Sequence, residues 1–307
     1  MQNTIDTFIP VNQPEYSKHF WNYAIGRDEH EKFLEAGMYA EAYRLPTNSE
    51  TKYNKALVRE SLFRRIGTYV YTRGESSMSR TKDSHDVAAW TDINHAIPVY
   101  DAINDFKDIE LDDKKLAMIV KLDSSFLHDN EYQFESHLIN RLARSFGQAE
   151  NDGFLNGNGV EQPEGLLHSA EMGVSVAGLS YDAVVRLFFS LDKDYRSRAA
   201  WIMNDETAMA LRLLKDANGN PLWNHSNDTI FGKEVFICNE MPSATVGNAP
   251  ICFGDYSYFW VVERSPMYVR ILRERFFDTD QIGYLAQERL DSKLIRPDAV
   301  KVMKINN

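Results

Sequence analysis

The sequence predicts an α+β protein in which a helix-based unit and a mixed α/β unit meet at one turn. Two observations carry this prediction. Apolar residues within 131–150 recur at three- and four-residue spacing, which places them on one face of a long helix. The chain then enters the segment QAENDGFLNGNGVEQPEGLL (148–167), whose Asn-Gly pairs tolerate positive φ and whose Pro163 cannot continue a helix. We interpret this segment as a firm helix stop followed by a joint.

Composition and charge narrow the class of protein. A chain of 307 residues can hold one large or two modest domains. A net charge of -11 argues against tight, phosphate-neutralising binding of nucleic acid, although weak contact stays open. Cys238 and Cys252 are too few for a disulfide framework. With no secretory signal and no apolar run of about 18 residues, we expect a soluble protein made in the cytoplasm.

The first third of the chain is expected to be loosely organised. Residues 1–15 are polar, carry two prolines and predict an extended arm. Helix-forming residues predict helices at 15–24 and 28–42, and a loop is expected at 46–49. Because this start is aromatic but weakly patterned, we expect it to cover a neighbour or its own fold rather than build a central core.

The next elements alternate between strand and helix patterns. Residues 55–71 change from a helical to an alternating pattern that ends in a strand around Tyr69 and Tyr71. Residues 72–112 are polar and then loosely alternating, which predicts a long projecting hairpin; loops of this length are usually functional or packed on a partner. Residues 115–122 predict a buried strand that precedes the long helix.

The second half has the rhythm of a mixed sheet. Ser180 is predicted to cap a helix over 181–191, and Asn204 or Asp205 a helix that ends near Leu214. Predicted strands are 199–203, 234–237, 250–253, 258–263, 267–272, 281–290 and 299–305.

No motif predicts a catalytic, cofactor-binding or metal-ligating residue. The glycines at 157 and 159 lack the third glycine of a dinucleotide loop, because Gln162 stands there. The calcium-like spacing that starts at Asp216 has Pro221 where the bending glycine belongs. The histidines show no zinc spacing. The acidic pairs 112/113 and 278/280 could serve a metal-dependent hydrolase or nuclease, but a solvated role is favoured for such loop carboxylates.

Five segments, in order, resemble the major capsid proteins of tailed phages with the Hong Kong 97-type fold. The first is FGQAENDGFLNGNGVEQPEGLL at 146–167, similar to the family's helix end and turn. The others are WIMNDETAMALRLLKDANGNPLW (201–223), FGKEVFICNEMP (231–242), ICFGDY (251–256) and ERLDSKLIRPDA (288–299). The resemblance covers about 116–302, most of the chain.

The resemblance implies a layout and a function. It implies an amino-terminal arm at 1–57, an extended loop at 72–112, a peripheral domain with a spine helix (58–71, 113–168 and 264–295) and an axial domain (169–263 and 296–307). The subunit would form pentamers and hexamers of an icosahedral shell around double-stranded DNA. The arm and the loop would complete their burial on neighbouring subunits. An encapsulin-like nanocompartment with protein cargo is the alternative within the structural class, and a soluble metal-dependent hydrolase is the alternative outside it.

Partners and location follow from the same resemblance. We expect a separate scaffolding protein, a portal, weak non-specific contact with packaged DNA and no membrane. The expected location is the virion, after assembly in the host cytoplasm, and no enzymatic activity is expected. Some family members cross-link subunits through a Lys-Asn bond assisted by a Glu. Here Asp280 and Gln287 stand at the Asn and Glu positions and Lys107 is not in register, so cross-linking is not favoured.

Overall fold

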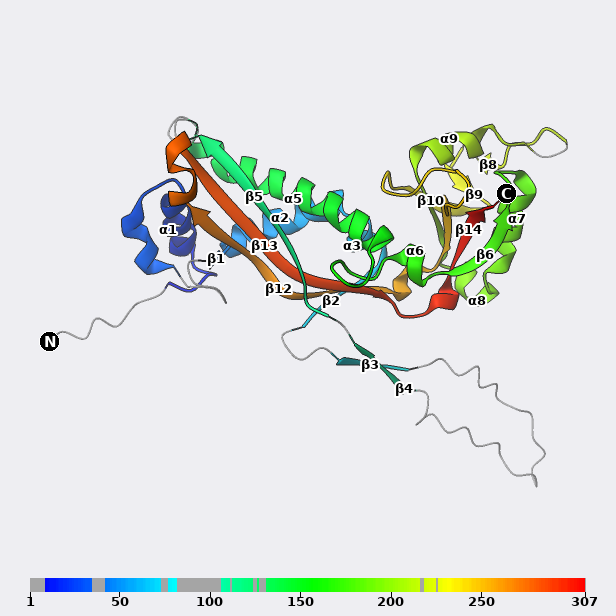
Figure 1. The fold of residues 1–307 in the computed structure, drawn as a ribbon, viewed down its shortest axis with the longest axis horizontal. Helices are drawn as coiled ribbons and strands as arrows, with labels where there is room; N and C mark the ends of the chain where they lie inside the picture. The colour runs from blue at the N-terminus through cyan, green and yellow to red at the C-terminus, as the bar shows by residue number, and fades with distance from the viewer. Residues whose placement is uncertain are drawn as a thin grey trace, which may run out of the picture.

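A computed structural model describes residues 9–34, 42–72, 77–81, 106–110, 112–123, 126, 131–215, 218–224 and 226–306. Two sheets lie toward opposite ends of the long axis, each with its own helices, and long strands of the first sheet lead into the second unit (Figure 1). None of the described helices is long and apolar enough to cross a membrane.

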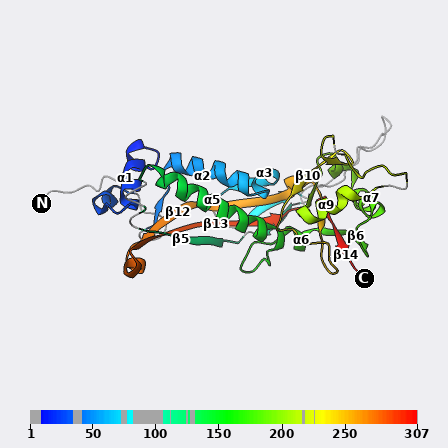
Figure 2. The same cartoon turned by 90° about the horizontal axis from the view of Figure 1, so that it is seen from above.

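The first unit is a sheet covered by two helices. Its strands run in the order β1 (Ala42–Arg44), β12 (Phe259–Leu272), β13 (Gln281–Leu294) and β5 (Lys114–Asp123), and β2 (Thr68–Tyr71) pairs with β12 in parallel. Helices α2 (Thr47–Glu60) and α5 (Glu131–Asn156) run side by side along the sheet, as Figure 2 shows from above. The short helix α3 (Phe63–Ile66) follows α2.

The amino-terminal region belongs to the core of this unit. Helix α1 (Pro14–Ala24) buries Tyr16, Phe20 and Tyr23 in the same apolar cluster as Phe134 of α5 and Tyr284 of β13. The Tyr284 hydroxyl donates to the Ala24 carbonyl at 2.8 Å. The expectation that this stretch would not build a central core is therefore wrong for its described part, because α1 and α2 bury their aromatic residues within the subunit.

Two local predictions in this region are also corrected. The loop expected at 46–49 is the first turn of α2, which begins at Thr47 directly after Pro46. Proline is well tolerated before a helix, since its fixed φ and missing N–H do no harm there. The helix expected at 28–42 is a 3-10 helix, η1 (Asp28–Phe33); residues 35–41 lie outside the described residues. The strand around Tyr69 and Tyr71 is confirmed as β2.

The second unit is a seven-stranded mixed sheet with three helices. Its order is β6 (Glu171–Val176), β14 (Val300–Ile305), β11 (Ile251–Gly254), β7 (Ala200–Met203), β10 (Lys233–Ile237), β9 (Thr229–Ile230) and β8 (Trp223–Asn224). The helices are α7 (Tyr181–Ser190), α8 (Lys193–Arg196) and α9 (Asp205–Leu213). The core centres on Trp201 of β7, whose ring stacks on Phe253 of β11 with centroids 4.1 Å apart.

The capping predictions hold here, and one strand prediction does not. The Ser180 hydroxyl accepts from the Ala183 N–H at 3.2 Å, and the Asn204 side chain from the Thr207 N–H at 2.8 Å, so Asn204 rather than Asp205 is the cap. The two strands expected at 258–263 and 267–272 form one strand, β12, with register shifts on either side of Ser265. Pro266 is accommodated because it falls in this irregular stretch.

The predicted hairpin is present in its described part. Strands β3 (Ser77–Thr81) and β4 (Phe106–Glu110) pair antiparallel, with Ser77 opposite Glu110. They lie beyond the first sheet, away from its covering helices (Figure 1). The expected hairpin tip, residues 82–105, lies outside the described residues.

Candidate functional site

The joint between the two units begins with the end of α5. The helix was predicted to stop at Glu150, but it continues to Asn156. The Asn151 side chain explains the extension, because it accepts from the Leu62 N–H at 2.8 Å and donates to the Glu60 carbonyl at 2.9 Å. The added turn is therefore held by the loop between α2 and α3.

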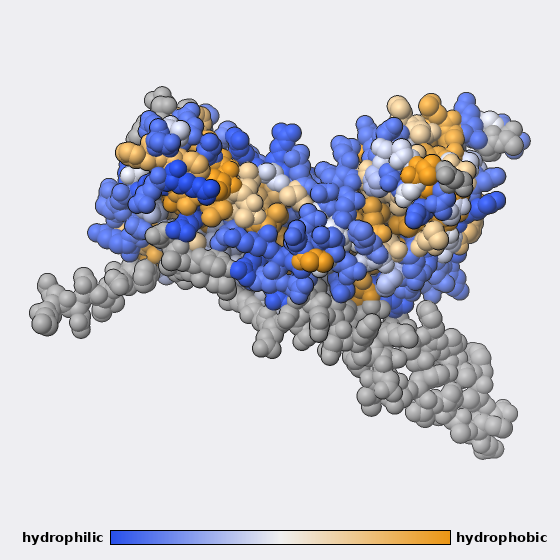
Figure 3. All heavy atoms as spheres, in the orientation of Figure 1, coloured by the Kyte–Doolittle hydropathy of each residue, from blue (hydrophilic) through white to orange (hydrophobic). Residues whose placement is uncertain are grey.

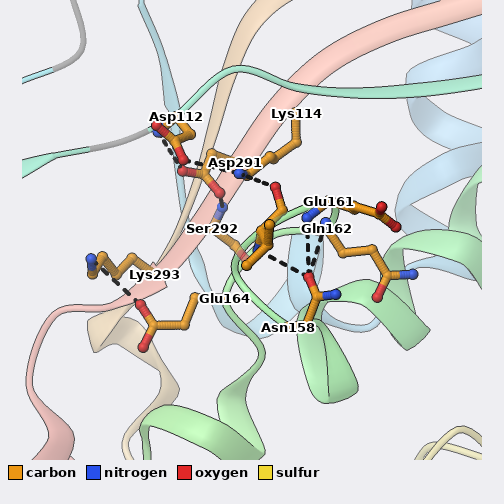
Figure 4. Close-up of polar contacts among 10 residues, drawn as sticks. Asp112, Lys114, Asn158, Glu161, Gln162, Glu164, Asp291, Ser292 and Lys293 are labelled. Atoms are coloured by element: carbon orange, nitrogen blue, oxygen red, sulfur yellow. Dashed lines mark hydrogen bonds and ion pairs between the residues drawn. The ribbon is translucent and has the colours of Figure 1, made fainter.

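The loop after α5 is closed by its own backbone and by one asparagine. The Gly165 N–H donates to the Gly157 carbonyl at 3.0 Å. The Asn158 side-chain oxygen accepts from the N–H groups of residues 160, 161 and 162 at 2.9, 3.1 and 3.3 Å (Figure 4). Since those N–H groups are already paired within the loop, they are not presented to a phosphate, and the loop is an Asx-type turn rather than a cradle.

Close approach, more than positive φ, explains the glycines of this loop. Gly159 has φ +73°, as a turn glycine does, whereas Gly157 does not have positive φ. A Cβ on Gly157 would lie 2.1 Å from the Pro163 carbonyl oxygen and 2.3 Å from that of Gly153. Gly157 is therefore needed because the helix end and the returning loop leave no room for a side chain.

The root of the hairpin is fastened to this joint. The backbone N–H of Asp112 donates to an Asp291 carboxylate oxygen on β13 at 2.7 Å. The Lys114 ammonium donates to the Val160 carbonyl at 2.6 Å and to the Asp112 carboxylate at 2.9 Å (Figure 4). Burial raises the pKa of Asp291, against the opposing effect of the Asp112 and Ser292 N–H groups that donate to it. The hairpin therefore leaves the subunit from a point shared by β13, β5 and the loop.

A buried ion cluster lies between the helices and the sheet near the joint. The Arg64 guanidinium donates to both Glu150 carboxylate oxygens, with contacts of 2.5–3.0 Å. It also lies 3.6 Å from Glu263 of β12 and 3.8 Å from Glu288 of β13. We call these four residues the Arg64 cluster. Sequence inspection missed it, because its members are scattered along the chain and none belongs to a local motif.

The acidic pairs weighed for hydrolase chemistry have other contacts. Asp112 pairs with Lys114, and Asp113 pairs with Arg289. Asp280 ends the turn η4 (Glu274–Thr279) with φ +51°. Within the described part of the chain, no group of three or more His, Cys, Asp or Glu is arranged to hold a metal ion. Burial raises the pKa of both cysteine thiols, which keeps them protonated and unreactive.

The two positions compared with the cross-linking chemistry of some phage capsids are separate in the subunit. Asp280 lies at the turn that precedes β13, and Gln287 lies within that strand opposite Tyr268 of β12. Gln287 is 9% exposed. A glutamine amide cannot take up a proton as a general base does.

Comparisons with known proteins agree with this architecture. A model of the phage capsid family matches residues 41–305. A solved capsid of an empty GTA particle is 25% identical, with a TM-score of 0.68, and the match covers 91% of this chain and 98% of that one. A chain from Mycobacterium phage Bobi is 14% identical, with a TM-score of 0.57, covering 80% and 90% of the two chains. The holo-SrpI encapsulin of Synechococcus elongatus is 13% identical, with a TM-score of 0.54, covering 80% and 87%. No curated protein matched.

Proposed function

The chain belongs to the phage capsid family, and on that premise we propose that it is the major capsid protein of a tailed phage, prophage or related particle. The observation that carries the proposal is the family match over residues 41–305. The protein is accordingly a structural subunit of a viral shell. The Hong Kong 97-type fold of the subunit agrees with this assignment.

The subunit surface has features that suit assembly into such a shell. Phe277, Leu213 and Val160 are large apolar side chains that are 85%, 75% and 75% exposed. Figure 3 shows apolar patches among hydrophilic residues on both units. Apolar residues exposed on a rigid scaffold are typical of surfaces that other subunits cover. We propose that neighbouring subunits in pentamers and hexamers cover these residues.

Phe277 is the most exposed of these side chains and stands on a well-anchored turn. On the same turn, Arg273 donates to the Tyr23 carbonyl and pairs with Asp28. The ring of the adjacent Phe276 lies under the Lys121 ammonium, 5.3 Å from the ring centroid. The turn therefore presents an aromatic side chain without needing to order itself on binding, as interface anchors do.

The roles of the chain segments follow from the fold and the family. We propose that α5 is the spine helix of a peripheral domain, that residues 72–112 form an extended loop and that the seven-stranded sheet belongs to an axial domain. Helices α1 and α2 pack into the core of the first sheet, so we propose that these two helices stay with their own subunit during assembly. The contacts of Asp291 and Lys114 would fix the root of the extended loop to the sheet of the first unit.

The remaining partners are also proposals. The net charge of each subunit is -11, so the shell would hold packaged double-stranded DNA by weak, sequence-independent contact, because the 34 Lys and Arg residues of the chain are outnumbered by 45 Asp and Glu. A separate scaffolding protein and a portal would direct closure of the shell. Assembly would take place in the cytoplasm of the host bacterium.

Electron microscopy of the expressed full-length protein tests the function. Negative-stain images and sedimentation are expected to show hollow polyhedral shells, or rings of five and six subunits. A stable monomer at high concentration would contradict the proposal. Mass spectrometry of any contents would separate the two kinds of shell, since a specific co-purifying protein cargo would favour a nanocompartment instead.

A further inference from the structure

The Arg64 cluster contains more negative than positive charge. Its one guanidinium faces three carboxyl groups, of Glu150, Glu263 and Glu288. The side chains of Arg64, Glu150 and Glu288 are 5%, 0% and 2% exposed, and that of Glu263 is 12% exposed. If all three carboxyl groups were ionised, the cluster would have a net charge of -2 in a nearly water-free place, which is strongly unfavourable.

The three carboxyl groups do not share Arg64 equally. Glu150 takes the two-pronged hydrogen bond, which is the strong geometry for a guanidinium and a carboxylate. Glu263 and Glu288 lie 3.6 and 3.8 Å from guanidinium nitrogens, beyond hydrogen-bond distance. One oxygen of Glu288 has no hydrogen-bond partner among the described residues. Glu288 is therefore the deeply buried member with the least compensation.

Among the described residues, Arg64 is the cation paired with Glu288, and the other groups near the cluster are as follows. Helix α2 contributes Tyr53, whose buried hydroxyl likewise has no hydrogen-bond partner among the described residues. Tyr69 of β2 places its ring against Arg64, 5.0 Å from the centroid. Glu50 of α2 adds a further carboxyl group near Glu263 and is itself paired with Arg44 at 3.7 Å. Tyr53 and Glu50 therefore add hydroxyl and acidic character to the surroundings of the cluster, and the Arg44 cation is paired with Glu50.

We propose that the Arg64 cluster holds one proton at neutral pH, on Glu288, and that this proton stabilises the packing of α3 and α5 on strands β12 and β13. Arg64 comes from α3 and Glu150 from α5, whereas Glu263 and Glu288 come from the two central strands. Loss of the proton would place a negative charge on Glu288 of the sheet close to the negative charge on Glu150 of α5. The cluster is thus a pH-sensitive contact between the two layers of the peripheral unit.

The surroundings of the carboxyl groups shift their pKa values in the direction that this geometry requires. Burial raises the pKa of Glu288 well above its usual value, Arg64 opposes that rise, and Glu150 and Glu263 add to it. Burial also raises the pKa of Glu263. A carboxyl group whose pKa is higher in the folded than in the unfolded state stabilises the fold fully below its unfolded pKa, about 4.3. That stabilisation is lost as the pH rises through the folded pKa.

Infrared spectroscopy of the full-length subunit tests for the proton directly. A protonated carboxyl C=O band is expected in the wild type at pH 7 and should be missing in Glu288→Gln, which imitates the neutral acid. The exposed Glu161→Gln serves as the matched control and should keep the band. Absence of the band from the wild type, or its persistence in Glu288→Gln, would overturn the proposal.

Urea unfolding of the dilute subunit between pH 5 and pH 8 provides a second measurement. Over the pH range in which folded Glu288 keeps its proton, raising the pH should destabilise the wild type relative to Glu288→Gln. The ratio of their unfolding equilibrium constants should change by about tenfold per pH unit. Glu161→Gln should run parallel to the wild type. Parallel behaviour of Glu288→Gln would refute the proton. If that variant does not fold, the infrared titration of the wild type is the deciding measurement. Disappearance of the carboxyl C=O band before pH 7 is reached, as the pH is raised, would refute the proposal.

Discussion

Substitution of Gly157 by alanine should destabilise the joint more than the same change two residues later. An alanine Cβ at 157 would lie 2.1 and 2.3 Å from two backbone oxygens, so the returning loop would have to move by about 1 Å or more to reach ordinary contact. At Gly159 the nearest atom, in Glu164, is 3.7 Å away, and the cost there comes from φ +73° alone. The pair of variants therefore separates a steric clash from backbone strain.

The magnitudes follow from the contacts. Forcing a methyl group into the gap at 157 costs about 1–3 kcal/mol. The hydrogen bond from the Gly165 N–H to the Gly157 carbonyl contributes about 0.5–1.5 kcal/mol that a displaced loop would lose. Reduced freedom of the unfolded chain offsets about 0.4–1 kcal/mol, and the midpoints of these ranges leave a net loss of about 2 kcal/mol. For Gly159→Ala, a left-handed cost of about 1–2 kcal/mol and the same offset leave about 1 kcal/mol.

Equilibrium urea unfolding of both variants and the wild type at one pH measures these losses. The expected order of stability is wild type, then Gly159→Ala, then Gly157→Ala. If Gly157→Ala proves as stable as Gly159→Ala, the close approach of the loop to the helix end is not a constraint in solution, and the reasoning about this joint is wrong.

Other contacts make further predictions. Asn151→Ala should lower the free energy of unfolding by about 1–3 kcal/mol, because it leaves the buried Leu62 N–H unpaired and removes the hydrogen bond to the Glu60 carbonyl; a loss below about 0.5 kcal/mol in urea unfolding would argue against this role of Asn151. Phe277→Ala should leave the subunit folded but raise the protein concentration needed for shells by about tenfold or more in light scattering, since burial of one aromatic side chain contributes about 1.5–3 kcal/mol. A Phe277→Ala protein that assembles at the wild-type concentration would exclude Phe277 from the subunit contacts.

The predictable parts of the fold are those encoded by neighbouring residues. A cap needs a side chain and an N–H three residues away, as at Ser180 and Asn204, and both caps were predicted and confirmed. The long helix was predicted from its apolar spacing, and strand β2 from its alternation. Resemblance to known capsid proteins, carried by five ordered segments, supplied the family that the comparison confirms.

What the sequence did not reveal depends on residues far apart in the chain. Asn151 prolongs α5 through a contact with Leu62, 89 residues away, so a boundary drawn from local pattern falls too early. Gly157 is required by the carbonyl of Pro163, although its sequence context indicated a positive φ. The start of the chain is weakly patterned in sequence, yet the core of the first sheet takes in the aromatic residues of α1 and Tyr53 of α2.

By itself, the sequence determined the class of fold, the joint at 148–167 and the capsid-like character of the chain. Only the tertiary structure decided which residues the joint brings together, where α5 ends and that Arg64 faces three carboxyl groups. The physical reason is that helix periodicity, caps and turns arise from interactions within a few residues, whereas burial and charge compensation depend on the packed neighbours of a side chain. Those neighbours come together only when α3 and α5 settle on β12 and β13.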